Sequence, residues 1–206
     1  MTQLDELEKA KHGGAKVPVL DLILRRWSPR AFEAKTVSDI DLATIFTAAS
    51  WAASSYNEQP WRFIVGRQGE EAWKKIFEAL APANQAWTKA APVLYVAIAR
   101  KTFSHNGSPN RVAVHDVGAA CATLSLQATA LGLHTHGMAG FTPESLRQSF
   151  GIPEEYDPIS CWALGYLGDP DTLPEHYRNM ELQPRTRKPL EAFVFTGWER
   201  AREFEA

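Results

Sequence analysis

Cysteine, long apolar runs and a surplus of charge of either sign are all scarce in this sequence. Its 206 residues include two cysteines, Cys121 and Cys161, which lie far apart in apolar surroundings and outside any Cys-x-x-Cys pair. This arrangement speaks against a disulfide scaffold and predicts reduced core residues in a cytoplasmic protein. The apolar runs are shorter than the roughly 20 residues that a membrane helix requires, so we expect no membrane segment.

Basic residues are nearly balanced by acidic ones, 22 Lys and Arg against 24 Asp and Glu, which gives a formal charge of −2. A nucleic-acid-binding protein normally carries a basic excess, so we expect no nucleic-acid partner. Residues 1–14 are polar and acidic, which predicts a polar N-terminal extension and not a signal peptide. His134 and His136 would share one face of a strand, but no third ligand is evident, so we favour a structural role and expect no metal.

Several motifs of nucleotide-binding folds and hydrolases are also missing. No Gly-x-Gly-x-x-Gly follows a strand, because "GYLGDP" lacks the third glycine, and no Gly-x-x-x-x-Gly-Lys-Ser/Thr occurs. The polar loop "SSYNEQP" lacks the glycines of a nucleophile elbow. The pair His115-Asp116 is interpreted as two surface residues of a helix. The sequence therefore offers no side-chain nucleophile with its base.

Hydrophobic periodicity predicts helices alternating with strands, without an internal repeat. Ser38 is the expected N-cap of a helix on which Leu42, Ile45 and Phe46 form an apolar face. After Pro170 the chain is polar and irregular for about 25 residues, longer than a usual loop, which favours a segment wrapped around another subunit. Helices are expected over 1–11, 18–27, 37–53, 69–80 (closed by Pro82), 112–133 and 142–151, and strands over 61–67, 91–100, 134–141, 160–168 and 192–198.

The stretch "LILRRWSPRAF" combines three arginines with a Ser-Pro step and has no acid between Asp21 and Glu33. In an extended chain, alternate residues point the same way, so Arg26, Ser28 and Arg30 would line one side. Two cations and a hydroxyl suit a phosphate. The alternative is a solvated helix end with arginines near its C-terminus. Taken alone, that alternative is slightly the better interpretation.

Two further polar segments could contribute to a site. "PRTRKP" places Arg185 and Arg187 in the same alternating pattern, although a solvated linker explains this cluster better when it is taken alone. The two arginine pairs could bind one phosphate only if the fold brought them together. "SSYNEQPW" gathers small hydrogen-bonding side chains in a loop between a helix and a strand, where function often lies, but polar turns are common.

In this order along the chain, four segments resemble the nitroreductase family of flavoenzymes, from about Leu20 to the C-terminal strand. "RRWSPRAF" resembles the family's Arg-x-Ser-x-Arg/Lys-x-Phe opening, and "AASWAASSYNEQPWRFIV" its Ala-Pro-Ser-Ser-x-Asn-x-Gln-Pro-Trp signature. "HDVGAACATLSLQATALGL" with "GMAGF" resembles its long helix and flavin-contacting turn. "RTRKPLEAFVF" resembles its basic C-terminal segment. The second segment is specific, and the others gain weight from their order.

The resemblance implies an α+β fold, in which helices flank a central, mostly antiparallel sheet. It implies one FMN-binding domain over 1–206 and a homodimer, with the C-terminal arm, 170–206, exchanged between subunits. The cofactor would be FMN, tightly but non-covalently bound at the dimer interface. NAD(P)H would be the transient reductant.

The resemblance also assigns roles to individual residues. Arg26 and Ser28 would bind the phosphate and ribityl chain, and Arg30 would lie near flavin N1 and the C2 carbonyl. A cation there would stabilise the reduced anion. The remaining implied cofactor-binding residues are Arg185 and Arg187 at the phosphate, Ser54, Ser55 and Asn57 reaching the other subunit's FMN, Asn84 near the pyrimidine edge, and Met138, Ala139 and Gly140 at the turn facing N5 and O4.

The implied activity is ping-pong hydride transfer from NAD(P)H through flavin N5 to a nitroaromatic, a quinone or another electron-poor acceptor. Alternatives within the fold are reduction of activated double bonds or aldehydes, dehalogenation and flavin degradation. A flavin-binding protein without turnover is a further alternative. The chain departs from the family pattern at Ala53, Ala139 and Trp27, and Trp27 could border the flavin. The segment 101–112, where members vary their substrate-covering elements, matches no particular member.

Overall fold

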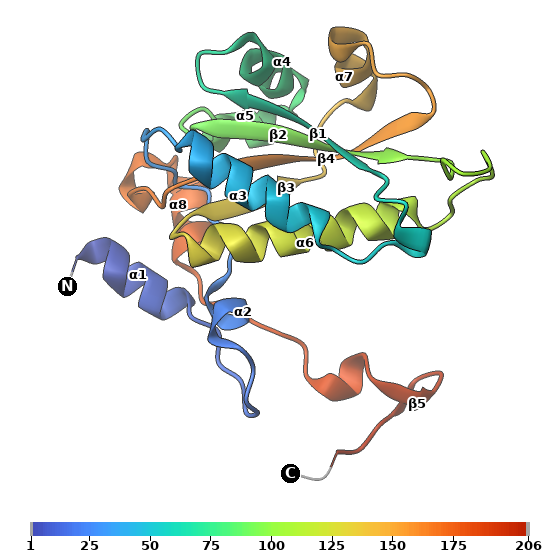
Figure 1. Ribbon diagram of the computed structural model, residues 1–206. Coiled ribbons are helices and arrows are strands. Elements are labelled where there is room, and N and C mark those ends of the chain that lie inside the picture. Colours follow the sequence, from blue (N-terminus) through green and yellow to red (C-terminus); the bar gives the residue numbers. More distant parts are fainter. Residues whose placement is uncertain (1, 205–206) are drawn as a thin grey trace.

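A four-stranded antiparallel sheet lies at the centre of the computed structural model, which describes residues 2–204 (Figure 1). The strands follow the order β1-β2-β4-β3, so both β2 and β4 are internal. Their bounds are Trp61–Arg67 for β1, Val93–Arg100 for β2, His134–Met138 for β3 and Tyr156–Gly165 for β4. The predicted combination of an antiparallel sheet with flanking helices is confirmed.

Strand β2 is buried on both faces because helices cover the sheet from both sides. Val93, Tyr95 and Ala97 face one core with α3 and α6, while Leu94 and Val96 face a second core. An uninterrupted apolar run is what such a doubly covered strand requires. The first layer consists of α3 (Asp39–Ser50) and α6 (Ala113–Ala130), and the second of α4 (Glu71–Ala79), α5 (Pro82–Thr88) and α7 (Pro143–Phe150).

Local capping chemistry sets helix ends where the sequence predicted them. The Ser38 hydroxyl accepts a hydrogen bond from the backbone N–H of Asp41 at 3.0 Å, which confirms the expected N-cap of α3. Gly151 ends α7 in the left-handed conformation, with φ of 64°, where glycine carries no Cβ penalty. These signals depend on neighbouring residues alone, so they can be found without knowledge of the fold.

Three predictions about helices and strands need correction. Pro82 does not close a helix but begins α5, because a proline at the first helical position needs no N–H partner. The strand expected at 160–168 begins earlier, at Tyr156. The stretch after Pro170 is not irregular, since it forms a 3-10 turn, η2 (Pro170–Thr172), and a helix, α8 (Glu175–Leu182).

The expected last strand, 192–198, is shorter and does not join the central sheet. Within the described residues, β5 (Phe195–Gly197) pairs with β6 (Arg200–Ala201) in a small hairpin after the turn η3 (Leu190–Ala192). This C-terminal arm leaves the body of the molecule, as Figure 1 shows. Its apolar side chains are exposed: Leu190, Phe193, Phe195 and Trp198, the last by 90%.

The N-terminal residues form a helix that packs on the body through two apolar side chains, Leu4 and Leu7. In α1 (Gln3–Lys11), Leu7 is buried against Trp27 and Leu167. The following α2 (Asp21–Arg25) is shorter than predicted, and the expected apolar face is largely exposed, with Leu20 74% accessible. No helix in residues 2–204 is both long and apolar enough to cross a membrane.

Candidate functional site

Two cavities of different character meet at the segment that contains Arg26 and Ser28, and both of these residues line both cavities. The larger cavity has a volume of about 670 Å³ and lies against α6, β3 and β4. It is mostly apolar. Its other lining residues are Ile23, Val117, Gly118, Cys121, Ala122, Ser125, Leu126, Gly137, Met138, Ala139, Ile159, Ser160 and Trp162.

The smaller cavity, of about 260 Å³, is lined by five basic side chains. They come from three distant segments: α1, the extended chain after α2, and the chain after α8. The basic residues are Lys11, Arg26, Arg30, Arg185 and Arg187. Thus the fold does bring the two predicted arginine pairs together.

The three residues predicted to line one side of "RRWSPR" reach one cavity, which Trp27 between them also lines. Arg26, Ser28 and Arg30 all line the smaller cavity, and Arg26 Nη1 donates a hydrogen bond to Ser28 Oγ at 3.3 Å. Arg25 lies elsewhere, with Nη1 at 3.9 Å from Asp21 Oδ2 within α2. The helix ends at Arg25, so the residues after it are extended and their side chains alternate.

Burial and mutual repulsion both disfavour the charged forms of three basic side chains in this cluster. Burial lowers the pKa of Arg26, and the charge of Arg187 lowers it further. Burial likewise lowers the pKa of Arg185, with added contributions from Arg187 and Arg26. Burial also lowers the pKa of Lys11. An anion placed among these cations would offset both the burial of their charges and their mutual repulsion.

One buried carboxylate, that of Glu181, balances part of the positive charge and fixes the backbone. Its Oε1 accepts hydrogen bonds from the backbone N–H groups of Arg30 (2.7 Å) and Ala31 (3.0 Å). Burial raises the pKa of Glu181, although these hydrogen bonds oppose the shift. The sequence analysis missed this residue because it missed α8. The nine residues between Pro174 and Pro184 were the available signal for a helix.

Arg30 lies in the smaller cavity and is not among the side chains that line the larger one. Its Nη1 is 3.9 Å from Glu181 Oε2, which is beyond hydrogen-bond distance. From the strand beneath, His136 Nδ1–H donates to the Pro29 carbonyl at 2.8 Å, and the His136 ring lies against Trp87. His136 therefore fixes the segment from Ser28 to Arg30, a role that the sequence analysis did not assign.

Because its pKa is perturbed, His136 should make the stability of the fold depend on pH. Burial lowers its pKa from 6.5 to about 4, and the charge of Arg30 acts in the same direction. The unfolded chain takes up the proton first as the pH falls below 6.5, so the folded state loses stability between pH 6.5 and 4. The loss is about 3 kcal/mol at most. Urea unfolding at pH 7 and 4.5 measures it.

His136→Asn is the test variant, since an asparagine N–H can still reach the Pro29 carbonyl. We expect it to remove most of this pH dependence. His115→Asn is the control, because the His115 side chain is 80% exposed, and it should keep the dependence of the parent. Equal pH dependence in the parent and His136→Asn would contradict the assignment.

Small residues leave room for a flat group in the larger cavity. At Gly118 of α6 an added Cβ would meet no atom within 4 Å, so the helix presents open space there. At Gly137 of β3 an added Cβ would lie 2.8 Å from the Trp162 ring, which requires glycine. Met138 and Ala139 line the same cavity, and their contact with a cofactor stays a prediction.

Trp27 lies behind the basic cavity, with its ring in the core. It is 5% exposed and packs against Leu7 and Leu167, and the Lys11 ammonium lies 4.9 Å from its ring centroid. The ring is one wall of the smaller cavity but does not line the larger one. We therefore interpret Trp27 as part of the wall of the basic cavity and not as a residue that borders a flat ring.

Asn84 and Gly140 do not line either cavity but support the turn beside the larger one. Asn84 Nδ2 donates to the Gly140 carbonyl at 2.8 Å. A Cβ at Gly140 would lie 2.9 Å from that nitrogen, so the two positions fit together. This hydrogen bond fixes the chain that follows Ala139.

Ser54, Ser55 and Asn57 lie on a loop that lines neither cavity. The loop has a strained backbone, with positive φ at Tyr56 (54°) and Asn57 (54°). Ser54 Oγ accepts from the Gln59 N–H at 3.1 Å, so the loop is internally braced. A strained but well-braced loop is typical of a binding segment, and within one chain it is not part of the two cavities.

Asp116 anchors this loop, which corrects the interpretation of His115-Asp116 as a surface pair. Asp116 is 3% exposed, and its Oδ2 accepts from the Ser55 N–H at 3.0 Å. Its other oxygen is 3.0 Å from His115 Nδ1. A carboxylate within an otherwise apolar helix was the available sequence signal.

Neither thiol chemistry nor a metal is supported by the described residues. Burial raises the pKa of both thiols, Cys121 and Cys161, to about 12, so they are protonated and poor nucleophiles. Both are free, as predicted. Residues 2–204 contain no group of three or more potential metal ligands. His134 and His136 instead make the separate contacts of structural histidines.

Known proteins resemble this chain over most of its length. The model of the "Nitroreductase family" matches residues 23–86 and 74–166. A protein of Archaeoglobus fulgidus, provisionally named NADH dehydrogenase/NAD(P)H nitroreductase, is 34% identical over 73% of this chain and 86% of its own length. A solved structure described as the oxidoreductase containing FMN is 38% identical, covers 91% of this chain and 96% of that chain, and has a TM-score of 0.86. A nitroreductase family protein of Clostridium difficile 630 is 26% identical, covering 87% of this chain and 98% of that chain, with a TM-score of 0.67.

Proposed function

The chain belongs to the nitroreductase family, and from this premise we propose that it is an FMN-dependent NAD(P)H oxidoreductase. One observation carries the proposal. A basic cavity and an apolar cavity share Arg26 and Ser28 as common walls. A ligand that fits both must have an anionic end joined to a flat, mostly apolar end. FMN has this composition, and the FMN described for the relative of 38% identity supports the assignment.

The donor set of the smaller cavity fits a phosphate. Arg26 and Arg187 would supply charge-assisted hydrogen bonds, and the Ser28 hydroxyl would supply one more. Arg185 Nη1 donates to the carbonyls of Lys11 and Leu24 at 2.7 and 2.6 Å, so it also positions the cavity wall. Binding a dianion here would offset the repulsion among the cations.

The chemistry that FMN supplies when bound is hydride transfer through N5, from NAD(P)H to an electron-poor acceptor such as a nitroaromatic or a quinone. We propose that the two substrates occupy the larger cavity in turn, which gives ping-pong kinetics. Arg30 is the proposed cation for the N1–C2=O region; its guanidinium makes no hydrogen bond to Glu181, and it follows Ser28, which lines both cavities. The backbone N–H of Ala139 or Gly140 is the proposed donor at N5 and O4.

We further propose a cytoplasmic homodimer in which the C-terminal arm covers the partner. The exposed Phe193 and Trp198 on the arm and the exposed Leu20 beside α2 support this assembly, since such side chains gain by burial. In it, Ser54, Ser55 and Asn57 would reach the partner's cofactor. The two free, buried cysteines are consistent with a reducing compartment.

The absorption spectrum of the purified protein tests the proposed function. We expect a yellow protein with a flavin spectrum, or a colourless one that becomes yellow with added FMN. NADH or NADPH should bleach the colour without oxygen, and a quinone or nitroaromatic should restore it. A protein that stays colourless with FMN contradicts cofactor binding. A yellow protein that neither nicotinamide bleaches contradicts the reductant, and bleaching without reoxidation by any acceptor supports a protein without turnover.

A further inference from the structure

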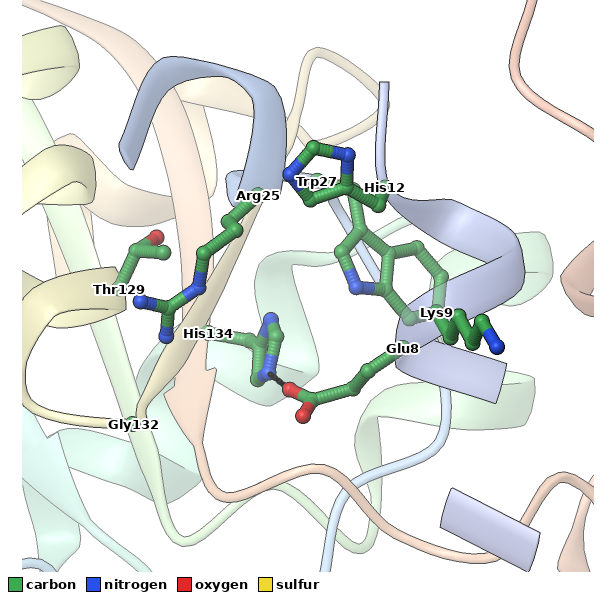
Figure 2. A pocket seen from close by; sticks show the side chains of 8 residues that line it. All are labelled: Glu8, Lys9, His12, Arg25, Trp27, Thr129, Gly132 and His134. Carbon is green, nitrogen blue, oxygen red and sulfur yellow. Dashed lines mark hydrogen bonds and ion pairs between the residues drawn. The ribbon is translucent and has the colours of Figure 1, made fainter. Parts of the chain in front are cut away.

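A third cavity, of about 230 Å³, shares Trp27 with the basic cavity as a lining residue (Figure 2). It is formed between α1, the end of α2, the end of α6 and the start of β3. All of α1 is outside the part of the chain that the family model matches. The lining residues are Glu8, Lys9, His12, Arg25, Trp27, Thr129, Gly132 and His134.

Two buried polar atoms at this cavity have no hydrogen-bond partner within the described residues. They are Trp27 Nε1 and His134 Nδ1, from side chains that are only 5% and 4% exposed. In Figure 2, the nitrogen edge of the Trp27 ring faces Arg25 and His134 across the space that the labelled side chains enclose. Buried polar groups are nearly always paired, so two unpaired ones at one cavity point to a ligand.

The hydrogen-bonding roles of these two atoms are opposite. An indole N–H is always a donor. His134 Nε2 is 3.2 Å from Glu8 Oε1, and this contact lowers the pKa of Glu8, which keeps it ionised. A carboxylate accepts, so Nε2 carries the proton and Nδ1 of a neutral His134 is an acceptor. The cavity wall therefore needs a ligand with both an acceptor and a donor.

The charges at the cavity are also of both signs. Arg25 makes only a long contact, 3.9 Å, with Asp21, so most of its N–H groups are free, and Figure 2 shows its guanidinium turned toward His134. Glu8 Oε2 is left as a free acceptor beside His134. The other two basic residues contribute less: His12 is paired with Asp21 at 2.8 Å, and the Lys9 ammonium points away in Figure 2.

We propose that this cavity binds a small zwitterion of the α-amino acid class. Its carboxylate would accept from Arg25 and the Trp27 N–H, and its ammonium would donate to Glu8 and His134 Nδ1. A simple anion would be repelled by Glu8, and a simple cation by Arg25. A zwitterion carries both charges a few atoms apart, which matches a cavity with one free acidic side chain, Glu8, and one free basic side chain, Arg25.

Occupancy of this cavity should affect the basic cluster because Trp27 is a wall of both cavities. Lys11 lies over the Trp27 ring, and Arg26 and Ser28 are its chain neighbours. A ligand that fixes the Trp27 ring would change the affinity of the basic cavity for its anion. The same coupling must operate in reverse, because linkage is reciprocal.

The indole N–H signal of Trp27 in a proton–nitrogen NMR spectrum of the full chain tests the site without reference to activity. It is identified among the seven tryptophans by its loss in Trp27→Phe. Glycine and L-serine should shift it in a saturable manner. Acetate and methylamine, which each carry half of the zwitterion, should not shift it at the same concentrations. No shift with either amino acid, or an equal shift with acetate, would overturn the proposal.

Matched variants on the cavity wall locate the binding. Arg25→Gln and Glu8→Gln each remove one charge-assisted contact, so glycine affinity should fall about tenfold to a hundredfold. Lys9→Gln is the control on the same helix and should bind as the parent does. Unchanged affinity in Arg25→Gln and Glu8→Gln would also overturn the proposal. Because FMN is absent from the titration, its outcome is independent of the proposed oxidoreductase activity.

Discussion

Arg26→Ala should weaken FMN binding by about tenfold to a hundredfold, while Arg25→Ala should leave it nearly unchanged. A hydrogen bond to a charged group contributes about 1.5–3 kcal/mol, which corresponds to this range of affinity. The two arginines are adjacent in sequence, but Arg26 lines the basic cavity and Arg25 does not. The comparison therefore tests side-chain direction and leaves the overall charge of the chain equal in the two variants.

Fluorescence quenching of FMN on binding to the apoprotein measures these affinities. Arg187→Ala should resemble Arg26→Ala, because Arg187 lies close enough to lower the pKa of Arg26. Raising the salt concentration should weaken FMN binding to the parent more than to Arg26→Ala or Arg187→Ala. Salt screens charge-assisted contacts, and each of these variants has already lost one of them. Equal losses in Arg25→Ala and Arg26→Ala would contradict the placement of the phosphate in the basic cavity.

Gly118→Leu should largely abolish FMN binding while the apoprotein stays folded. A Cβ at this position meets no protein atom within 4 Å, so the larger side chain extends into the apolar cavity without displacing the core. Replacing a glycine within a helix also adds up to about 1 kcal/mol of stability. We expect at least a hundredfold weaker FMN binding, roughly 3 kcal/mol, with an unfolding temperature equal to or above that of the parent.

Gly118→Ala is the matched control for this prediction. It adds the same backbone stabilisation but only one methyl group, so most FMN affinity should remain. Thermal unfolding followed by circular dichroism separates the two effects. If Gly118→Leu bound FMN as well as Gly118→Ala did, the flat ring would not lie in the cavity beside α6.

The sequence predicted those parts of the fold that depend on neighbouring residues. The Ser38 cap, a helix that ends near Gly151 and a strand over 91–100 all follow from short-range patterns, and the structure has each of them with small shifts in bounds. The errors arose where local signals are ambiguous or weak. Pro82 can end one helix or begin the next, and α8 is short, polar and only partly buried.

The candidate site was predicted in part, because alternation along an extended chain is itself a local property. The alternation predicted that Arg26, Ser28 and Arg30 would line one side of the chain, and in the structure all three line the smaller cavity. It could not place Glu181, whose contacts with the N–H groups of Arg30 and Ala31 join segments far apart in the chain. It could not show that α1 packs on Trp27, because that contact joins residues far apart in the chain.

The sequence by itself determined most helices and strands, the main cap signals and the assignment of Arg25 to a helix end, and its resemblance to a family implied the antiparallel α+β architecture. Only the tertiary structure decided that Arg26 and Arg187 share one cavity, that this cavity adjoins an apolar one, and that Trp27 lines both it and a third. The physical reason is the distance along the chain over which each feature is determined. Backbone conformation and side-chain alternation depend on nearby residues, whereas the repulsion among buried cations exists only after packing has brought distant segments together.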